Sequence, residues 1–225
     1  MLRPTLNTFA LWGAQLAQGA LQGHLDKAET ALGPLRTGEP GVRIHDIEAL
    51  KPLLVSGGCI GSIAASVLGE AARPVRAILF NKTPKANWAL GWHQDRTICV
   101  KEKREAPGFG PWTVKVGLIH VEPPFEVLAG MVTLRAHLDD VAESNAPLLI
   151  APGSHLLGRL TVREIEEAVG RCGTQVCLAQ AGDVWLYSTP ILHASEAASA
   201  PTRRRVLQVD YAVGELPHGL QWLGV

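Results

Sequence analysis

Cysteine is scarce in this chain of 225 residues: its four copies are Cys59, Cys99, Cys172 and Cys177, and no pair has CxxC spacing. Four thiols are too few to form the disulfide scaffold of a domain of this size. We therefore expect all four cysteines to be reduced and to have structural roles.

An excess of charge is also missing, because Lys and Arg number 21 and Asp and Glu number 21. Without a basic field, binding to nucleic acid or to an anionic membrane is not expected.

Apolar stretches end well before the roughly 18 residues that a spanning helix needs. The apolar stretch at the N-terminus is interrupted by Asn7, Gln15 and Gln18, so this segment fits a secretory signal poorly. Neither GxxxxGK[ST] nor GxGxxG occurs, which argues against nucleotide chemistry. We expect a cytoplasmic protein.

Hydrophobic residues make up 47% of the chain, enough for one sizeable core, and the length suits a single domain over residues 1–225. Leu and Ala recur at helical intervals in the first third, which predicts helices over residues 6–32, 45–55 and 60–72. Residues 1–73 would then form a helical buttress.

The sequence pattern changes at residue 74. From there to residue 214, short β-branched runs are bounded by Gly, Pro, Asn or Asp. Such runs predict a β-sandwich or barrel over 74–214, followed by a tail over 215–225. Thr161 with Glu164 three residues later matches a capping box and predicts one helix within this region. The expected fold class is α+β, mainly β.

His-x-Asp dipeptides are the first chemical signal, because two imidazoles and one carboxylate hold non-haem iron while leaving positions open. The chain contains three: His24 with Asp26, His93 with Asp95, and His137 with Asp139. The first falls in a predicted helix, where residues two apart diverge by about 200° and cannot easily share an ion. Strand spacing allows either of the other two pairs, so periodicity alone leaves that choice open.

Three longer strings resemble one enzyme family. They are GWHQD at 91–95, SNAPLLIAPGSHLLG at 144–158 and GDVWLYSTPILHAS at 182–195. Together they are similar to the phytanoyl-CoA dioxygenase family of iron(II)- and 2-oxoglutarate-dependent oxygenases. The resemblance implies a double-stranded β-helix, a jelly-roll of the cupin type, with flanking N-terminal helices. It also implies iron(II), 2-oxoglutarate and O2 as cofactor and co-substrates, and oxidation of a small organic molecule with release of succinate and CO2.

Matching the motifs residue by residue implies that His93, Asp95 and His193 are the metal ligands, with no catalytic residue beyond them. The presence of Asp95 favours oxygen insertion, because halogenating relatives lack this carboxylate. Ala146 and Ala194 stand where the family often has glycine, and they leave the substrate open.

A guanidinium fork suits the distal carboxylate of 2-oxoglutarate, and the chain offers Arg203, Arg204 and Arg205 in a row. By resemblance, Arg204 and Ser195 bind this carboxylate, and Tyr211 matches a tyrosine further along the strand. On a strand, Arg203 and Arg205 share one face while Arg204 takes the other. Strand alternation therefore predicts that either Arg204 or the pair Arg203 and Arg205 points into the protein, but it does not say which of the two.

Other side chains could line a substrate pocket, since aromatic and a few polar groups make typical small-molecule sites. The candidates are Trp92, Lys82, Arg135 and Trp112. The loop over residues 101–111 is either a lid or simply exposed. Asp183, after Gly182, is expected to be a turn residue.

Two alternative functions remain: a cupin-type metal enzyme without a keto acid, and an inactive barrel that only binds a small molecule.

Overall fold

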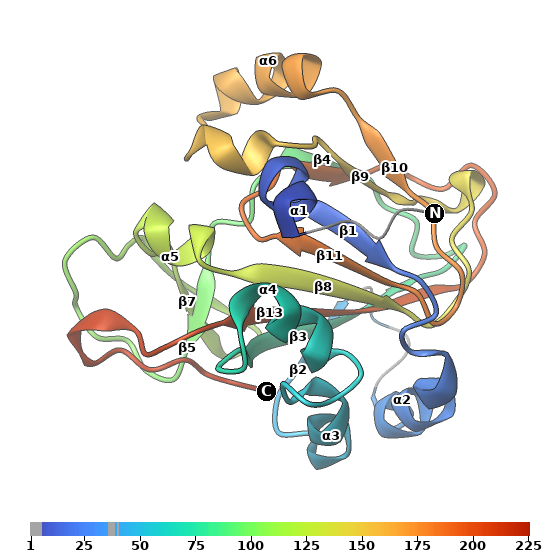
Figure 1. Cartoon of the computed structure of the whole chain (residues 1–225), viewed down its shortest axis with the longest axis horizontal. Helices are drawn as coiled ribbons and strands as arrows, with labels where there is room; N and C mark the ends of the chain where they lie inside the picture. Colours follow the sequence, from blue (N-terminus) through green and yellow to red (C-terminus); the bar gives the residue numbers. More distant parts are fainter. Residues whose placement is uncertain (1–5, 36–38, 40) are drawn as a thin grey trace.

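The computed structural model describes residues 6–35, 39 and 41–225, and its centre is a pair of facing antiparallel sheets (Figure 1). The larger sheet contains β1 (Ala14–Ala17), β2 (Gly41–Ile44), β3 (Arg73–Lys82), β8 (Val132–His137), β11 (Val184–Ser188) and β13 (Arg204–Ala212). The smaller contains β4 (Leu90–His93), β9 (Leu148–Ile150), β10 (Gln175–Cys177) and β12 (His193–Ser195). Their orders are β1-β11-β8-β13-β3-β2 and β10-β9-β12-β4. This is the predicted double-stranded β-helix.

Helices and a small third sheet surround this core. The α-helices are α1 (Leu6–Trp12), α2 (Leu25–Leu32), α3 (Lys51–Leu54), α4 (Gly61–Leu68), α5 (Phe125–Ala129) and α6 (Val162–Cys172). Short 3-10 helices are η1 (Gln22–His24), η2 (Glu48–Leu50), η3 (Glu143–Asn145), η4 (Ser154–Leu157) and η5 (Pro217–Gly219). The third sheet, in the order β5-β7-β6, contains β5 (Ile98–Val100), β6 (Trp112–Lys115) and β7 (Leu118–Val121). The described helices include none long and apolar enough to cross a membrane.

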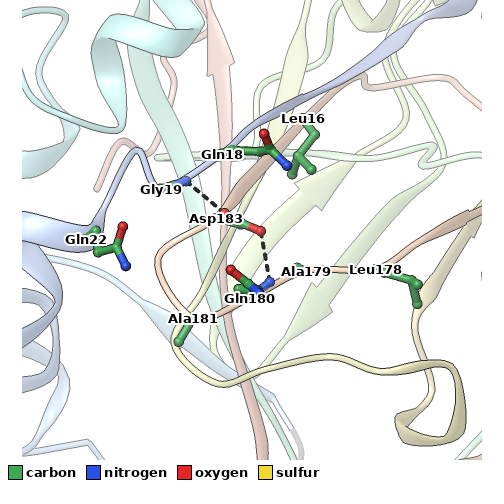
Figure 2. A pocket seen from close by; sticks show the side chains of 9 residues that line it. All are labelled: Leu16, Gln18, Gly19, Gln22, Leu178, Ala179, Gln180, Ala181 and Asp183. Carbon is green, nitrogen blue, oxygen red and sulfur yellow. Dashed lines mark hydrogen bonds between the residues drawn. The ribbon is translucent and has the colours of Figure 1, made fainter. Parts of the chain in front are cut away.

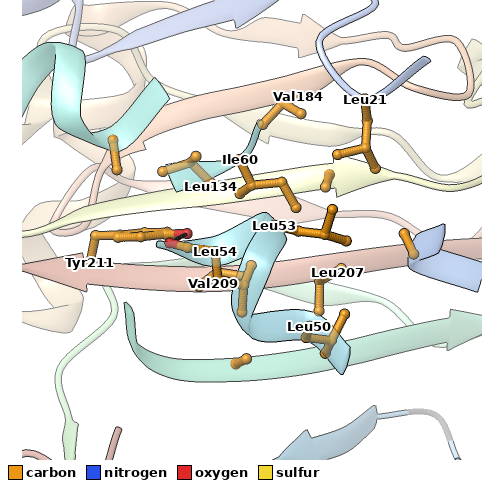
Figure 3. Close-up of a cluster of buried hydrophobic side chains, with 14 of the residues drawn as sticks. Leu21, Leu50, Leu53, Leu54, Ile60, Leu134, Val184, Leu207, Val209 and Tyr211 are labelled. Carbon is orange, nitrogen blue, oxygen red and sulfur yellow. Dashed lines mark hydrogen bonds between the residues drawn. The ribbon is translucent and has the colours of Figure 1, made fainter. Parts of the chain in front are cut away.

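The two faces of the larger sheet differ sharply in polarity. On β8 and β13, Leu134, Leu207 and Val209 belong to a hydrophobic cluster with residues of α2, α3 and α4 (Figure 3). Successive side chains of a strand point to opposite faces, so Arg135 and Gln208, which are also buried, face the smaller sheet. The inner face of the larger sheet therefore carries buried polar side chains.

The N-terminal region differs from the predicted helical buttress. The helix expected over 6–32 ends at Trp12; Gly13 has a positive φ of 73° and leads into β1, which pairs with β11. Residues 41–44 form β2 beside β3. Both strands lie at the edges of the larger sheet, where tertiary pairing overrides weak local preference. Residues 1–5, 36–38 and 40 of the buttress lie outside the described residues.

The other predicted helices are shorter than expected but lie where the pattern put them. The segment 45–55 contains η2 and α3, and 60–72 contains α4. The capping box of Thr161 and Glu164 is confirmed at the start of α6. All four cysteines are free, as expected.

The expected tail and loop both pack against the third sheet. Leu220 and Trp222 are buried in a cluster with Val100 and Val121 of that sheet, and the Leu223 amide donates to the Cys99 carbonyl. The 101–111 loop adds buried Ala106 and Phe109 to the same cluster, so this loop is anchored at its centre.

Candidate metal centre

Two histidines from neighbouring strands of the smaller sheet face each other across the candidate metal site. His93 ends β4, His193 begins β12, and the two are register partners. Their ring centroids lie 4.2 Å apart and are tilted by 54°. Asp95 follows β4 closely, and the possible ligand atoms of all three residues lie within 4.8 Å of one another. Within the described residues, no other group of His, Cys, Asp or Glu meets this condition.

Backbone carbonyls fix the tautomer of both imidazoles. His93 Nδ1 lies 2.8 Å from the Gly91 carbonyl oxygen, and His193 Nδ1 lies 3.0 Å from that of Ile191. A carbonyl can only accept, so each Nδ1 carries the proton and each Nε2 keeps its lone pair. Burial lowers the pKa of His193 to about 4, which leaves it neutral near pH 7. Both rings are thus set to donate to a metal.

Arg76 on β3 holds the third candidate ligand. Its Nη2 lies 3.4 Å from Asp95 Oδ2, and its Nε lies 2.5 Å from Asp210 Oδ2 on β13. Burial, the largest influence, would raise the pKa of Asp95, but Arg76 and the two histidines together hold it below its ordinary value. For Asp210, burial wins and its pKa is raised. The guanidinium therefore keeps Asp95 ionised and in place.

Sequence reasoning missed Arg76 and Asp210. Each is a charged residue with apolar neighbours on both sides in a β-branched run, VRAILF and RVLQVDYAV respectively. Buried charges in such strands are expected to be paired, and that signal could have identified them.

A second polar group lies between the sheets near the start of β13. Arg204 is 2% exposed and donates to the Ala146 carbonyl, and its buried Nε has no partner. Ser195 Oγ accepts from Lys82 Nζ at 3.1 Å. Burial lowers the pKa of Lys82 to about 8, helped by Arg204 and Arg135. These cations and the unpartnered nitrogen fit an anionic ligand.

The neighbouring arginines are used elsewhere. Arg205 Nε and Nη2 donate to Asp139 at 3.0 and 2.8 Å, and Arg205 also pairs with Glu29 of α2. Arg203 is largely exposed and contacts Asp139 at 3.4 Å. Of the three, Arg204 is the one whose side chain is buried between the sheets, which decides the question left open by strand alternation. Tyr211 lies on the opposite face, where its hydroxyl donates to the Leu54 carbonyl.

The competing His-x-Asp pairs do not form a site. His137 is buried and both its ring nitrogens lack partners, whereas Asp139 is occupied by Arg205. His24 ends η1 and Asp26 lies in α2, and neither belongs to a described metal-binding group.

The four predicted pocket residues divide into two groups. Lys82 and Arg135 face the space between the sheets and are buried. Trp92 lies on the other side of β4, packed against the cluster that includes Ile165 of α6. Trp112 packs against the third sheet's cluster with Lys103 over its ring. The structure thus brings neither tryptophan to the three candidate ligands, because each serves a different hydrophobic cluster.

A surface hollow of about 560 Å³ lies apart from this centre (Figure 2). It is lined by Leu16, Gln18, Gly19, Gln22, Leu178, Ala179, Gln180, Ala181 and Asp183, and contains none of the candidate ligands. Asp183 accepts from the backbone amides of Gly19 and Gln180 at 2.7 and 2.8 Å. This confirms Asp183 as a turn residue and gives the hollow no reactive group.

A double-stranded β-helix in which the possible ligand atoms of two histidines and one carboxylate lie within 4.8 Å of one another is typical of a non-haem iron enzyme. The sequence profile of phytanoyl-CoA dioxygenase (PhyH) matches residues 48–206, which is 159 of the 225 residues. The chain belongs to the phytanoyl-CoA dioxygenase family and is an iron- and 2-oxoglutarate-dependent enzyme. No curated protein matches it by sequence.

Solved structures share the fold at low sequence identity. EctD from S. alaskensis has a TM-score of 0.68 at 16% identity, covering 100% of this chain and 81% of its own. The epimerase SnoN from nogalamycin biosynthesis, described as non-haem and α-ketoglutarate-dependent, has a TM-score of 0.67 at 18% identity, covering 93% and 81%. HygX from Streptomyces hygroscopicus, solved with nickel and 2-oxoglutarate, has a TM-score of 0.63 at 17% identity, covering 95% and 87%.

Proposed function

We propose that this enzyme binds iron(II) through His93, Asp95 and His193 and binds 2-oxoglutarate through Arg204 and Ser195. It would use them with O2 to hydroxylate, or otherwise oxidise, a small organic molecule, releasing succinate and CO2. The observation that carries the proposal is that the described residues contain both a His-Asp-His group and a buried, incompletely paired arginine on the inner faces of the two sheets.

The three candidate ligands have separate tasks. His93 and His193 present Nε2 because their Nδ1 protons are engaged by carbonyls. Asp95 supplies the negative charge and is oriented by Arg76. Three protein ligands leave open positions on the ion for a bidentate keto acid and O2. O2 is the oxidant and 2-oxoglutarate, on becoming succinate and CO2, would supply two electrons to it; the bound iron would supply the redox chemistry, and the protein's part is placement.

The distal carboxylate of 2-oxoglutarate is assigned to Arg204. A guanidinium positions a carboxylate in both place and orientation, and the Arg204 Nε is buried without a partner. Ser195 is two residues after His193 on the same short strand, so the ligand and the carboxylate-binding hydroxyl are fixed by one element. Lys82, which donates to Ser195 Oγ, adds a second positive charge there.

The test is succinate formation from 2-oxoglutarate by the purified, iron-loaded protein in air. We expect slow turnover without a prime substrate, abolished by His193→Ala and strongly reduced at limiting 2-oxoglutarate by Arg204→Gln. Arg203→Gln, which removes an exposed arginine next to it, is the matched control and should behave as wild type. Iron-dependent chemistry that needs no 2-oxoglutarate would favour a cupin-type enzyme without a keto acid. Ligand binding without any succinate would favour an inactive binding barrel.

A further inference from the structure

Arg135 is a second buried arginine between the two sheets. It lies on the inner face of β8 and is 8% exposed. Its Nε lies 3.3 Å from the Tyr187 hydroxyl and its Nη2 3.1 Å from Gln208 Oε1. Its guanidinium carbon is 5.3 Å from the centre of the Phe80 ring. All of these partners are neutral, and within the described residues no carboxylate forms an ion pair with Arg135.

The balance of charge in this space is positive. Arg76, Lys82, Arg135 and Arg204 contribute cations, whereas the described carboxylates there are Asp95 and Asp210. Arg76 contacts both carboxylates. A buried charge without a counter-charge is strongly unfavourable. Arg135 and Arg204 therefore both need an anion from outside the chain.

Arg135 stands between the candidate metal site and Arg204. Tyr187, which binds its Nε, has its ring 5.7 Å from the ring of His193. On β13, Gln208 is the register partner of Arg135, and Arg204 lies four residues from Gln208 towards the start of that strand. Residues on one face of a strand repeat about every 7 Å. Along β13, Arg204 is thus two such repeats, about 14 Å, from the register partner of Arg135, while Tyr187 links Arg135 to the metal end.

We propose that Arg135 binds the metal-proximal carboxylate of 2-oxoglutarate, so that two arginines hold the two ends of the dianion. The assignment rests on the proposed function, in which Arg204 binds the distal carboxylate. Tyr187 and Gln208 hold the guanidinium of Arg135 in position, and one co-substrate supplies the counter-charge for both arginines. Arg135 is accordingly a binding residue for the co-substrate, and the prime substrate need not carry a negative charge.

The experiment compares two keto acids that differ only at the distal end. 2-Oxopentanoate has a methyl group where 2-oxoglutarate has its distal carboxylate, and both keep the carboxylate beside the keto group. Iron(II)-loaded wild type, Arg135→Gln and Arg204→Gln proteins are titrated without O2, and the visible metal-to-ligand charge-transfer band gives each Kd. We expect Arg135→Gln to raise the Kd of both keto acids by a similar factor, about tenfold or more. Arg204→Gln should weaken 2-oxoglutarate only.

A second variant separates binding from folding. A buried charge without a counter-charge is itself unfavourable, so replacing it with an apolar side chain of similar size removes that cost. Arg135→Met should therefore leave the thermal unfolding temperature of the ligand-free protein unchanged or raised, while the increase caused by a given concentration of 2-oxoglutarate becomes smaller. Arg135→Lys should recover part of the affinity because it restores the charge.

Each contrary result overturns the assignment differently. Unchanged Kd values for both keto acids in Arg135→Gln would mean that Arg135 serves the prime substrate or the fold. Weaker binding of 2-oxoglutarate alone would place Arg135 at the distal carboxylate. A wild-type protein that loads iron but gives no band with 2-oxoglutarate would refute the proposed function itself. This result is distinct from the two contrary outcomes of the Kd measurements on Arg135→Gln.

Discussion

Arg76→Met is the most informative test of how the metal centre is held together. The substitution removes one cation from between Asp95 and Asp210, whose side chains are 22% and 2% exposed. Removing one partner of a buried ion pair costs about 3–5 kcal/mol, because the remaining charge is left uncompensated. Asp95 is partly solvated, so we expect the lower end, about 3 kcal/mol. For a domain of this size that is a fall in melting temperature of about 6–12 °C.

The same substitution should weaken iron binding. Arg76 keeps the pKa of Asp95 below its ordinary value, so without it the carboxylate is held less firmly in its ionised form. Loss of a group that orients a metal ligand typically costs about 10- to 100-fold in affinity. Iron binding by competition with a chelator and unfolding of the metal-free protein, followed by calorimetry, give the two readouts separately.

Arg73 offers a matched control on the same strand. It pairs with Glu215 at 2.8 Å, but the two side chains are 40% and 73% exposed. Exposed pairs contribute about 0–1 kcal/mol, so Arg73→Met should have a small effect and leave iron binding intact. If Arg76→Met and Arg73→Met destabilised the protein equally, or if Arg76→Met kept full affinity for iron, the account of Arg76 would be wrong.

Three further predictions follow. His193→Ala should abolish iron binding measured by metal analysis, whereas His137→Ala should keep it; the reverse would restore the competing pair. Arg204→Gln should raise the Kd of 2-oxoglutarate about tenfold or more while Arg203→Gln leaves it unchanged, by anaerobic titration; equal effects would contradict the inward placement of Arg204. Burial lowers the pKa of His137 to about 3, against 6.5 for a free histidine. Because the folded-state pKa is depressed, the unfolded chain takes up a proton first, and stability present above pH 6.5 is lost as pH falls towards 3. His137→Asn should therefore reduce the loss of unfolding free energy between pH 7 and pH 5 by about 2 kcal/mol, measured by denaturant titration of metal-free protein; an unchanged loss would count against a buried, neutral His137.

The strand-rich half of the fold was predictable because its signals are local. Short β-branched runs between turn residues gave the sheet strands, and the capping box of Thr161 and Glu164 gave the start of α6. The edge strands β1 and β2 were not predictable in the same way. AQLA has no strong strand preference, and GVRI, although it contains Val42 and Ile44, is only four residues long; both strands depend on pairing with β11 and β3.

In the candidate site, too, the features with local sequence signals were predictable, and those that depend on strand pairing were not. The motif around His93 and Asp95 could be recognised from the sequence, but only the fold brings His193 to them as a register partner. Alternation showed that Arg204 differs from its neighbours without saying which face is inside. The roles of Arg76 and Arg135 depend on contacts between strands distant in sequence, and those contacts appear only once the sheet is assembled.

In the proposed function, His93, Asp95 and His193 hold an iron(II) ion that 2-oxoglutarate chelates. The most direct measurement is the anaerobic addition of 2-oxoglutarate to iron(II)-loaded wild-type protein, followed by visible absorption. We expect a charge-transfer band that saturates at one 2-oxoglutarate per iron and is absent in His93→Ala. A wild-type protein that carries its iron and shows no such band, or an undiminished band in His93→Ala, would contradict the proposed function.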